Sequence, residues 1–266
     1  MTGGPIDRRL FLRDLGKGTL SITVFGFLVA CSSDQKAVTT VAGTATTELL
    51  STTTGPVTAT SAPEAATPET GAASWQRVEL GFVSAYIIVR GGEAAIVDTG
   101  VIGSAPSIEA GLAAAGLGWD SVGHVILTHL HPDHIGGLGA VLASAADASG
   151  YAGEPDIPSI SSPRPLLAVG DGDRVFDLEV IATPGHTAGH ICVLDAVGGL
   201  LVAGDALTGV DGGVAGPNPD FTADLTTAEA SVRKLAGFSF DTVVFGHGDP
   251  VEGGASQAVA DLAAGL

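Results

Sequence analysis

The sequence has few cysteines, few basic side chains and no long apolar run. Two cysteines among 266 residues exclude a disulfide-stapled scaffold and a zinc site built from thiolates. Only 11 Lys and Arg stand against 29 Asp and Glu, for a net charge of −18. A surface this acidic repels phosphate backbones, so nucleic acid is excluded as a partner. No apolar stretch reaches the roughly 20 residues that a membrane-spanning helix needs, so an integral membrane protein is excluded as well.

The first 31 residues have the features of an export signal. The pair Arg8-Arg9 precedes a short apolar stretch, Thr19–Ala30, which ends directly at Cys31. This order resembles a twin-arginine signal joined to a bacterial lipoprotein signal, in which the cysteine receives lipid. We therefore expect residues 1–31 to direct export and Cys31 to anchor the protein to the outer face of the bacterial cell membrane. The alternative is an amphipathic N-terminal helix with a buried Cys31.

A linker and one folded domain are expected to follow. Residues 32–74 contain 17 Ser and Thr among 43 residues and almost no large apolar side chains, so we predict a disordered linker. Residues 75–266 hold 6 basic and 23 acidic side chains and form the predicted domain. The membrane is then a partner through the lipid anchor only.

The domain is predicted to alternate between strands and helices. Short β-rich runs and Ala-rich segments with helical spacing follow one another, which favours sheets covered by helices. The expected strands are 76–80, 85–90, 94–98, 122–128, 175–183, 191–195, 200–203 and 242–245. The expected helices are 104–117, 226–235 (started by a capping box at Thr226 and Glu229) and 256–262.

A histidine-rich motif follows the apolar strand at 122–128. In an extended segment residues i and i+2 point the same way, so His129 and His131 can converge on one cation. Asp133 and His134 come after the turn at Pro132 and can face a neighbouring point. Three His and one Asp at this spacing predict a metal site.

Three further groups stand where strands should end. His186 follows the strand at 175–183, Asp205 follows 200–203, and His247 follows 242–245. Imidazole and carboxylate ligands without thiolate suit zinc, iron or manganese rather than a closed structural zinc site.

These motifs resemble the metallo-β-lactamase-fold hydrolase superfamily. The resemblance covers residues 75–266 through Val97-Asp98-Thr99-Gly100, the HxHxDH box at 129–134, the Pro-Gly-His-Thr box at 184–187, Gly204-Asp205 and Gly246-His247-Gly248. It implies an α/β domain, an αβ/βα four-layer sandwich with the metals at one edge of the sheets. It also implies that His129, His131 and His186 bind one metal, that Asp133, His134 and His247 bind a second, and that Asp205 bridges them.

The resemblance further implies a dinuclear metal-dependent hydrolase. Two divalent cations, expected to be zinc with iron or manganese as alternatives, share a water and generate hydroxide near neutral pH. The hydroxide attacks an ester, lactone, thioester or related bond of a small-molecule substrate. Asp133 and Asp205 are the predicted catalytic residues, with Asp205 relaying a proton to the leaving group.

Several alternatives remain open at this stage. A mononuclear-iron thiol or persulfide oxygenase shares much of the motif set, and a non-catalytic metal-binding lipoprotein would keep the ligands without turnover. True β-lactamases of this fold lack an aspartate at the position of Asp205, which argues against that activity. Glyoxalase-II-like thioesterases carry a C-terminal extension, whereas 19 residues follow His247 here. Homoserine-lactone lactonases usually have Tyr where this chain has Thr208.

Other residues receive weaker assignments. Asp98 is expected either to orient a ligand histidine or to be a simple turn residue, and His190 to support the ligands or lie at the rim. His124 and Cys192 are expected to be structural. The Gly- and Pro-rich stretch 207–221 is expected to form a loop over the metals, with Val214 and Phe221 offering apolar contact and Phe82 and Val83 lining the opposite wall.

Overall fold

The computed structural model describes residues 73–266 of the chain. The predicted signal, Cys31 included, and all but the last two residues of the predicted linker lie outside the described residues. Within the described part, no helix combines the length and apolar character needed to cross a bilayer.

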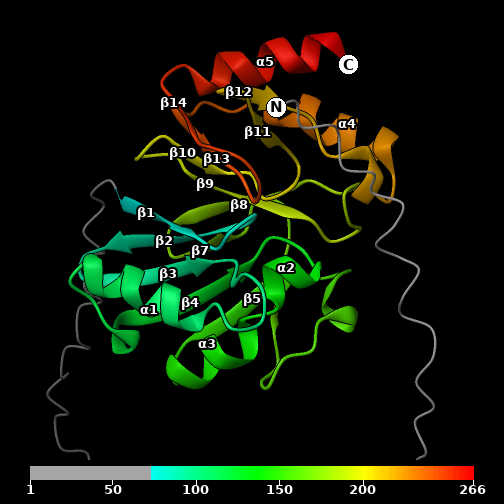
Figure 1. The fold of residues 1–266 in the computed structure, drawn as a ribbon. Helices are drawn as coiled ribbons and strands as arrows, with labels where there is room; N and C mark the ends of the chain where they lie inside the picture. The colour runs from blue at the N-terminus through cyan, green and yellow to red at the C-terminus, as the bar shows by residue number, and fades with distance from the viewer. Residues whose placement is uncertain (1–72) are drawn as a thin grey trace, which may run out of the picture. The chain divides into compact units, whose positions relative to one another are not determined.

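Two six-stranded mixed sheets form the centre of the domain (Figure 1). The first has the order β1-β2-β3-β4-β5-β6, with β3 to β6 parallel to one another. The second has the order β14-β13-β10-β9-β8-β7, in which only β10 and β13 are a parallel pair. The strands of the first sheet are β1 (Ser74–Glu79), β2 (Ser84–Arg90), β3 (Glu93–Val97), β4 (Val122–Leu127), β5 (Ser149–Gly153) and β6 (Leu167–Val169). Those of the second are β7 (Arg174–Val175), β8 (Leu178–Ala182), β9 (Ile191–Asp195), β10 (Leu200–Val202), β13 (Thr242–Val244) and β14 (Val251–Glu252).

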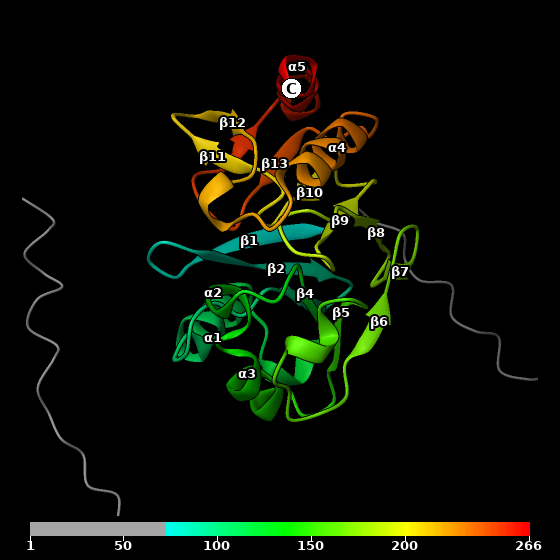
Figure 2. The same cartoon turned by 90° about the vertical axis from the view of Figure 1, so that its right-hand side faces the viewer.

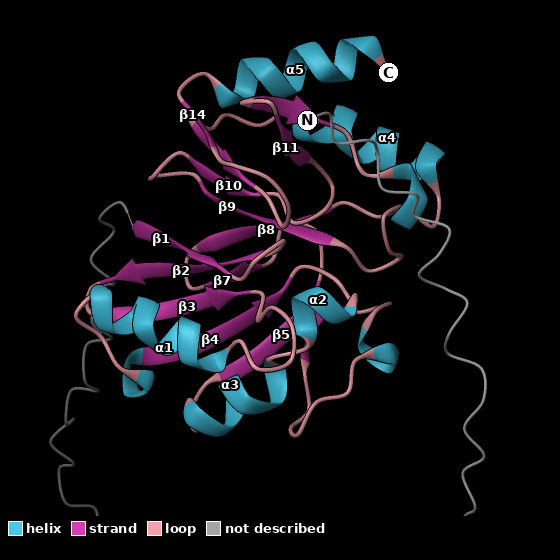
Figure 3. Cartoon of the chain, in the orientation of Figure 1, coloured by secondary structure: helices cyan, strands magenta, loops and turns pink. Residues whose placement is uncertain are grey.

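Helices cover the outer face of each sheet (Figures 2 and 3). α1 (Ala105–Ala114) and α3 (Leu138–Ser144) pack on the first sheet, and α4 (Leu225–Leu235) and α5 (Ala255–Gly265) pack on the second. The short helix α2 (Pro132–Ile135) and the hairpin of β11 (Thr208–Val210) and β12 (Gly213–Ala215) complete the domain, with 3₁₀ turns at Trp119–Ser121, Ile157–Ser159 and Pro219–Phe221. The αβ/βα four-layer sandwich expected from the resemblance is confirmed.

Three apolar cores lie between the four layers. Because side chains alternate along a strand, Ile87 of β2 packs against α1 and α3 while Ile88 packs between the sheets. In β9, Val193 likewise faces the first sheet and Leu194 faces α4 and α5. Both faces of these strands are buried, which is why they read as continuous apolar runs.

Two expectations about local structure are wrong. The run 175–183 is not one strand but the hairpin β7–β8, because Phe176 and Asp177 adopt φ of 53° and 58° and reverse the chain. Helix α4 is not started by a capping box at Thr226. Its N-cap is Asp224, whose carboxylate accepts a hydrogen bond from the Thr227 N–H at 3.1 Å.

Candidate metal centre

All seven predicted ligands meet at the ends of strands from both sheets. His129 and His131 lie in the loop after β4, and Asp133 and His134 lie on α2. His186 lies between β8 and β9, Asp205 after β10, and His247 after β13. Their nitrogen and oxygen atoms form three overlapping groups, each within 4.8 Å: His129, His131 and His186; His129, His134 and Asp205; and Asp133, His134 and His247.

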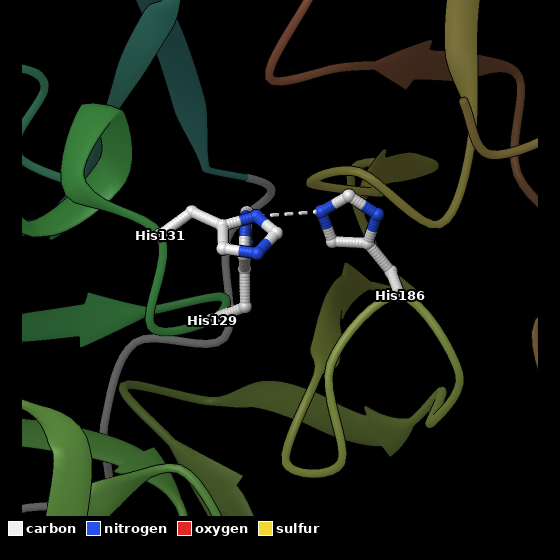
Figure 4. Close-up of side chains that lie close together, drawn as sticks. All are labelled: His129, His131 and His186. Atoms are coloured by element: carbon white, nitrogen blue, oxygen red, sulfur yellow. Dashed lines mark hydrogen bonds between the residues drawn. The ribbon is translucent and has the colours of Figure 1, made fainter. Parts of the chain in front are cut away.

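In the first group, three imidazole nitrogens converge on one point (Figure 4). His131 Nδ1 lies 3.0 Å from His129 Nε2 and 2.9 Å from His186 Nε2. Zinc–imidazole bonds of about 2.0–2.1 Å in a tetrahedron place ligand nitrogens about 3.3 Å apart, so this spacing is close to that of a zinc site. One proton cannot satisfy three nitrogens at once, whereas one cation can.

Beside the first group, Asp133 and Asp205 face two further histidines, His134 and His247. His247 Nε2 lies 3.3 Å from Asp133 Oδ2 and 3.3 Å from Asp205 Oδ2. Asp205 Oδ2 also lies 3.4 Å from His186 Nε2. Asp205 Oδ1 lies 3.3 Å from His134 Nε2. The Asp205 carboxylate therefore contacts His186 of the first group and His134 and His247 of the third, as a residue that bridges two cations must.

Two buried atoms of the centre have no hydrogen-bond partner. Among the described side chains, His134 Nε2 and Asp205 Oδ1 are two of the three buried nitrogen and oxygen atoms in that state, the third being Arg90 Nε. A buried polar atom without a partner is costly, and a cation between these atoms would remove that cost. Five imidazoles and two carboxylates also form a donor set that zinc, iron and manganese accept. The residues present therefore fit two divalent cations.

Nearby carboxylates raise the pKa of some histidines in the centre, whereas burial lowers the pKa of others. Burial opposes a charge on His134, but Asp98 and Asp205 outweigh it and raise its pKa to about 10. Hydrogen bonds to Asp133 and Asp205 raise the pKa of His247 to about 10. Burial instead lowers the pKa of His186 to about 4. The pKa of a histidine in this centre thus rises where carboxylates hydrogen-bond to the ring and falls where burial dominates.

Asp98 orients two of the predicted ligand histidines. His134 Nδ1 donates to Asp98 Oδ2 at 2.7 Å, which directs His134 Nε2 toward Asp205. The Thr128 hydroxyl donates to the same Asp98 oxygen at 2.8 Å and lies 3.0 Å from His129 Nδ1, whose proton it can accept. Of the two expectations for Asp98, the structure places it in the orienting role, with φ of 62° at the end of β3.

Two further ligand histidines are held through their outer nitrogens. His247 Nδ1 donates to the carbonyl oxygen of Phe82 at 2.7 Å. His186 Nδ1 lies 3.2 Å from the hydroxyl of Thr222, which itself donates to the Asn218 carbonyl. These partners set the tautomer in which Nε2 faces the centre.

Asp156 joins the two ligand loops and was missed from the sequence. It is fully buried, and its Oδ1 accepts from the Gly189 N–H at 2.7 Å. Its Oδ2 accepts from the Thr187 hydroxyl at 2.6 Å and from the Leu130 N–H at 3.1 Å. One carboxylate thereby ties the His129–His131 loop to the loop of His186. An aspartate just after a parallel strand was the available signal, but β5 was not predicted.

His190 supports Asp205 from behind. Its Nε2 accepts from the Asp205 backbone N–H at 3.1 Å, and its Nδ1 lies 2.8 Å from the Thr183 hydroxyl. Burial lowers the pKa of His190 to about 3, so the ring is neutral and can accept that bond. The expected supporting position is the one observed.

His124 and Cys192 lie outside the centre. His124 is half-buried on β4, against the rings of Tyr151 and Phe176. Cys192 is buried in the core of the second sheet, and burial raises its pKa to about 12, which argues against a nucleophile. Both residues are structural, as expected.

A cavity of about 450 Å³ opens in front of the centre. Its inner wall is formed by four of the seven residues, His131, Asp133, Asp205 and His247. Its other lining residues are the apolar Phe82, Pro132 and Phe221 and the neutral polar Thr208 and Asn218. Phe82 and Phe221 therefore line the cavity as expected.

Val83 and Val214 do not line this cavity. Val83 is buried, and Val214 packs against the core of the second sheet. The expected loop 207–221 also contains the hairpin β11–β12 and ends in a 3₁₀ turn.

Several known proteins are similar to this chain. The family model described as the metallo-beta-lactamase superfamily matches residues 78–247. A hydroxyacylglutathione hydrolase of Rhodospirillum rubrum is 36% identical over 142 residues, which is 51% of this chain and 51% of the relative. The thioesterase pkgB of Emericella nidulans is 33% identical over 133 residues, 49% of this chain and 36% of the relative. The chain thus spans about half or less of the length of these curated relatives.

Solved structures share the fold. A metallo-beta-lactamase family protein from Thermus thermophilus is 25% identical with a TM-score of 0.58, over 73% of this chain and 78% of that one. TTHA1623, solved in a di-iron-bound form, is 25% identical with a TM-score of 0.58, over 69% of this chain and 98% of that one.

Proposed function

Since the chain belongs to the metallo-beta-lactamase superfamily, we propose that its centre holds two divalent cations and hydrolyses an ester, lactone, thioester or related bond of a small molecule. The observation that carries this proposal is the convergence of five imidazoles and two carboxylates. Two atoms of this cluster, His134 Nε2 and Asp205 Oδ1, are buried and have no hydrogen-bond partner. The names of two relatives, a thioesterase and a hydroxyacylglutathione hydrolase, support an acyl substrate.

Each of the seven residues has a role in this proposal. One cation would be held by the histidines of the first group, the other by Asp133, His134 and His247, with Asp205 holding both. When bound, the cations supply Lewis acidity to a carbonyl oxygen and lower the pKa of a water molecule. Zinc and iron both suit the donor set, and the di-iron form of TTHA1623 supports iron as an alternative to zinc.

The side chains around the cavity would position the substrate and move protons. The carboxylates of Asp133 and Asp205 both line the cavity, where they can accept a proton from the attacking water and return it to the leaving group. His190 and Asp98 keep Asp205 and His134 in position, so the geometry is set before substrate arrives.

The first prediction concerns metal content. Protein purified without chelator is expected to contain close to two equivalents of zinc or iron by elemental analysis, because a His or Asp stands at each of the seven proposed ligand positions. The metal-loaded protein is expected to turn over at least one member of a panel of neutral esters, thioesters and lactones. Protein stripped with chelator serves as the control, and readdition of metal is expected to restore turnover.

Two results would separate the alternatives. A content that stays at one equivalent in the presence of excess metal contradicts the dinuclear site and favours a mononuclear-iron oxygenase. Two equivalents with no turnover on the whole panel favour a non-catalytic metal-binding protein.

The second prediction concerns location. We propose that lipid on Cys31 holds the domain at the outer face of the cell membrane, with residues 32–74 as the spacer; a random coil of 43 residues would have an r.m.s. span of about 35 Å. The sequence order of Arg8-Arg9, apolar core and Cys31 supports this proposal. Cys31→Ser is expected to remove the mature protein from the membrane fraction and to leave precursor or released protein. A variant that fractionates and migrates like the parent would contradict the anchor.

A further inference from the structure

Two aromatic rings stand exposed in the cavity in front of the metal centre. Phe82, in the loop between β1 and β2, is 67% exposed, and Phe221, at the end of the 3₁₀ turn Pro219–Phe221, is 68% exposed. Most large apolar side chains of the domain are buried in its three cores, so two exposed phenylalanines lining one cavity require an explanation.

We infer that this cavity binds a neutral substrate with an apolar acyl chain or ring, which packs on Phe82 and Phe221 while its scissile bond faces the metal centre. The inference rests on the proposed hydrolase function and names its substrate class. Four steps support it.

Phe82 contacts His247 of the proposed metal centre. Its ring lies parallel to that of His247, with an interplanar angle of 3° and 6.0 Å between centroids. Its carbonyl oxygen accepts the His247 Nδ1 proton. A group that packs on the Phe82 ring therefore lies directly beside a proposed ligand and shields it from water.

Phe221 places the second contact close to the other metal group. Phe221 and His131 line this cavity and also a neighbouring one, which includes His186 and Thr222. Because two residues belong to both cavities, the cavities adjoin at Phe221. The ring therefore borders both cavities, and an apolar group can pack on it from the cavity that Phe82 also lines.

The walls of the cavity offer neutral hydrogen-bonding groups rather than cations. Among the described residues, Thr208 and Asn218 are its only polar lining residues besides the proposed ligands. A carboxylate or phosphate remote from the scissile bond would thus meet aromatic and neutral side chains.

The basic side chains of the described residues are engaged elsewhere. Each of them makes an ion pair or a hydrogen bond to a carbonyl, in the pairs Arg77–Asp249, Arg90–Asp195, Arg164–Leu142, Arg174–Asp177, Arg233–Glu229 and Lys234–Asp171. Residues 75–266 also carry 23 acidic against 6 basic groups, which repels anionic substrates at a distance. Both facts favour a neutral substrate over one with several carboxylates.

The test compares 4-nitrophenyl acetate, butyrate and octanoate with the 4-nitrophenyl monoester of suberic acid, using the metal-loaded full chain. The suberate ester matches octanoate in length but ends in a carboxylate. Each buried methylene is expected to raise kcat/KM by about fourfold until the cavity is full, so burial of about three of the six additional methylenes already makes octanoate exceed acetate by at least about 30-fold. Octanoate should exceed the suberate ester by at least about tenfold.

Two variants and a matched control locate the effect. Phe82→Ala and Phe221→Ala are each expected to lower the octanoate-to-acetate ratio of kcat/KM by at least about fivefold, mainly through KM. Val197→Ala removes a side chain that is similarly exposed, 64%, but lies after β9 at the end opposite the centre. It is expected to leave the ratio unchanged.

A binding measurement distinguishes this inference from the proposed function. The neutral fluorophore N-phenyl-1-naphthylamine is expected to bind the chain, to be displaced by octanamide, and to bind at least about fivefold more weakly to both Phe variants. Binding with this pattern, but no hydrolysis of any ester, sinks the proposed function and keeps the apolar site. Hydrolysis without chain-length preference, or binding unaffected by both variants, overturns the inference and leaves the hydrolase intact.

Discussion

Asp205→Asn is expected to lower turnover by at least about 100-fold, which corresponds to about 2.7 kcal/mol of transition-state stabilisation. The amide keeps the shape of the carboxylate but loses the charge that lies within 3.4 Å of His134, His186 and His247. Metal content is expected to fall from two equivalents to one or fewer, because this carboxylate touches both ligand groups. Turnover and elemental analysis measure the two effects separately.

The matched control is Asp211→Asn. Asp211 lies in the exposed turn of the β11–β12 hairpin with φ of 50°, a conformation that asparagine tolerates well. The Asp211→Asn substitution removes the same charge, six residues along the chain from Asp205. The variant protein should retain both metals and parental turnover. Melting temperatures of the two variants should lie within a few degrees of the parent. Near-parental kcat with two metals in the Asp205 variant would refute the bridging role.

Gly246→Ala is expected to remove most metal binding without unfolding the domain. A Cβ at this position would overlap the Asp205 carboxylate and the His134 ring. Gly246 cannot move away easily, because its carbonyl accepts from the Ser84 N–H at 2.9 Å and its own N–H donates to Gly204 at 3.0 Å. The added methyl group therefore displaces the ligands, and we expect metal affinity to fall at least about 100-fold, measured by titration of the stripped protein with zinc.

Gly123→Ala is the control for this experiment. Gly123 lies on β4, and a Cβ there meets no atom within 4 Å. Its zinc affinity and circular dichroism should match those of the parent. If the Gly246 variant binds zinc as tightly as Gly123→Ala, the close approach of this backbone segment is not needed by the site.

The convergence of the seven proposed ligands was predictable because the motif is local and strand ends are easy to recognise. His129, His131, Asp133 and His134 share one short segment, and an apolar run before it marks the strand. His186, Asp205 and His247 likewise follow apolar runs, and the fold brings those strand ends to one edge. The fold class and the meeting of these seven side chains could therefore be predicted from the sequence together with the family resemblance.

The supporting contacts were not predictable, because they depend on tertiary approach. Asp156 meets Leu130 and Thr187 across 26 and 31 residues, and no local pattern marks such a contact. The backbone carbonyl of Phe82 accepts a hydrogen bond from His247. Every residue has such a carbonyl, so the residue type at position 82 does not indicate this contact. The β7–β8 turn was missed for a third reason, since Phe176 adopts a left-handed conformation that usually signals glycine.

The bond between His247 and Phe82 also constrains the order in which the chain can mature. The two residues are 165 positions apart, so at a synthesis rate of about 5–20 residues per second the β1–β2 hairpin waits roughly 8–33 s for its partner to emerge from the ribosome. Until then, the first sheet carries four of the seven proposed ligands with nothing opposite them. A nascent chain therefore cannot complete the proposed site of Asp133, His134 and His247 until its last strands have been synthesised.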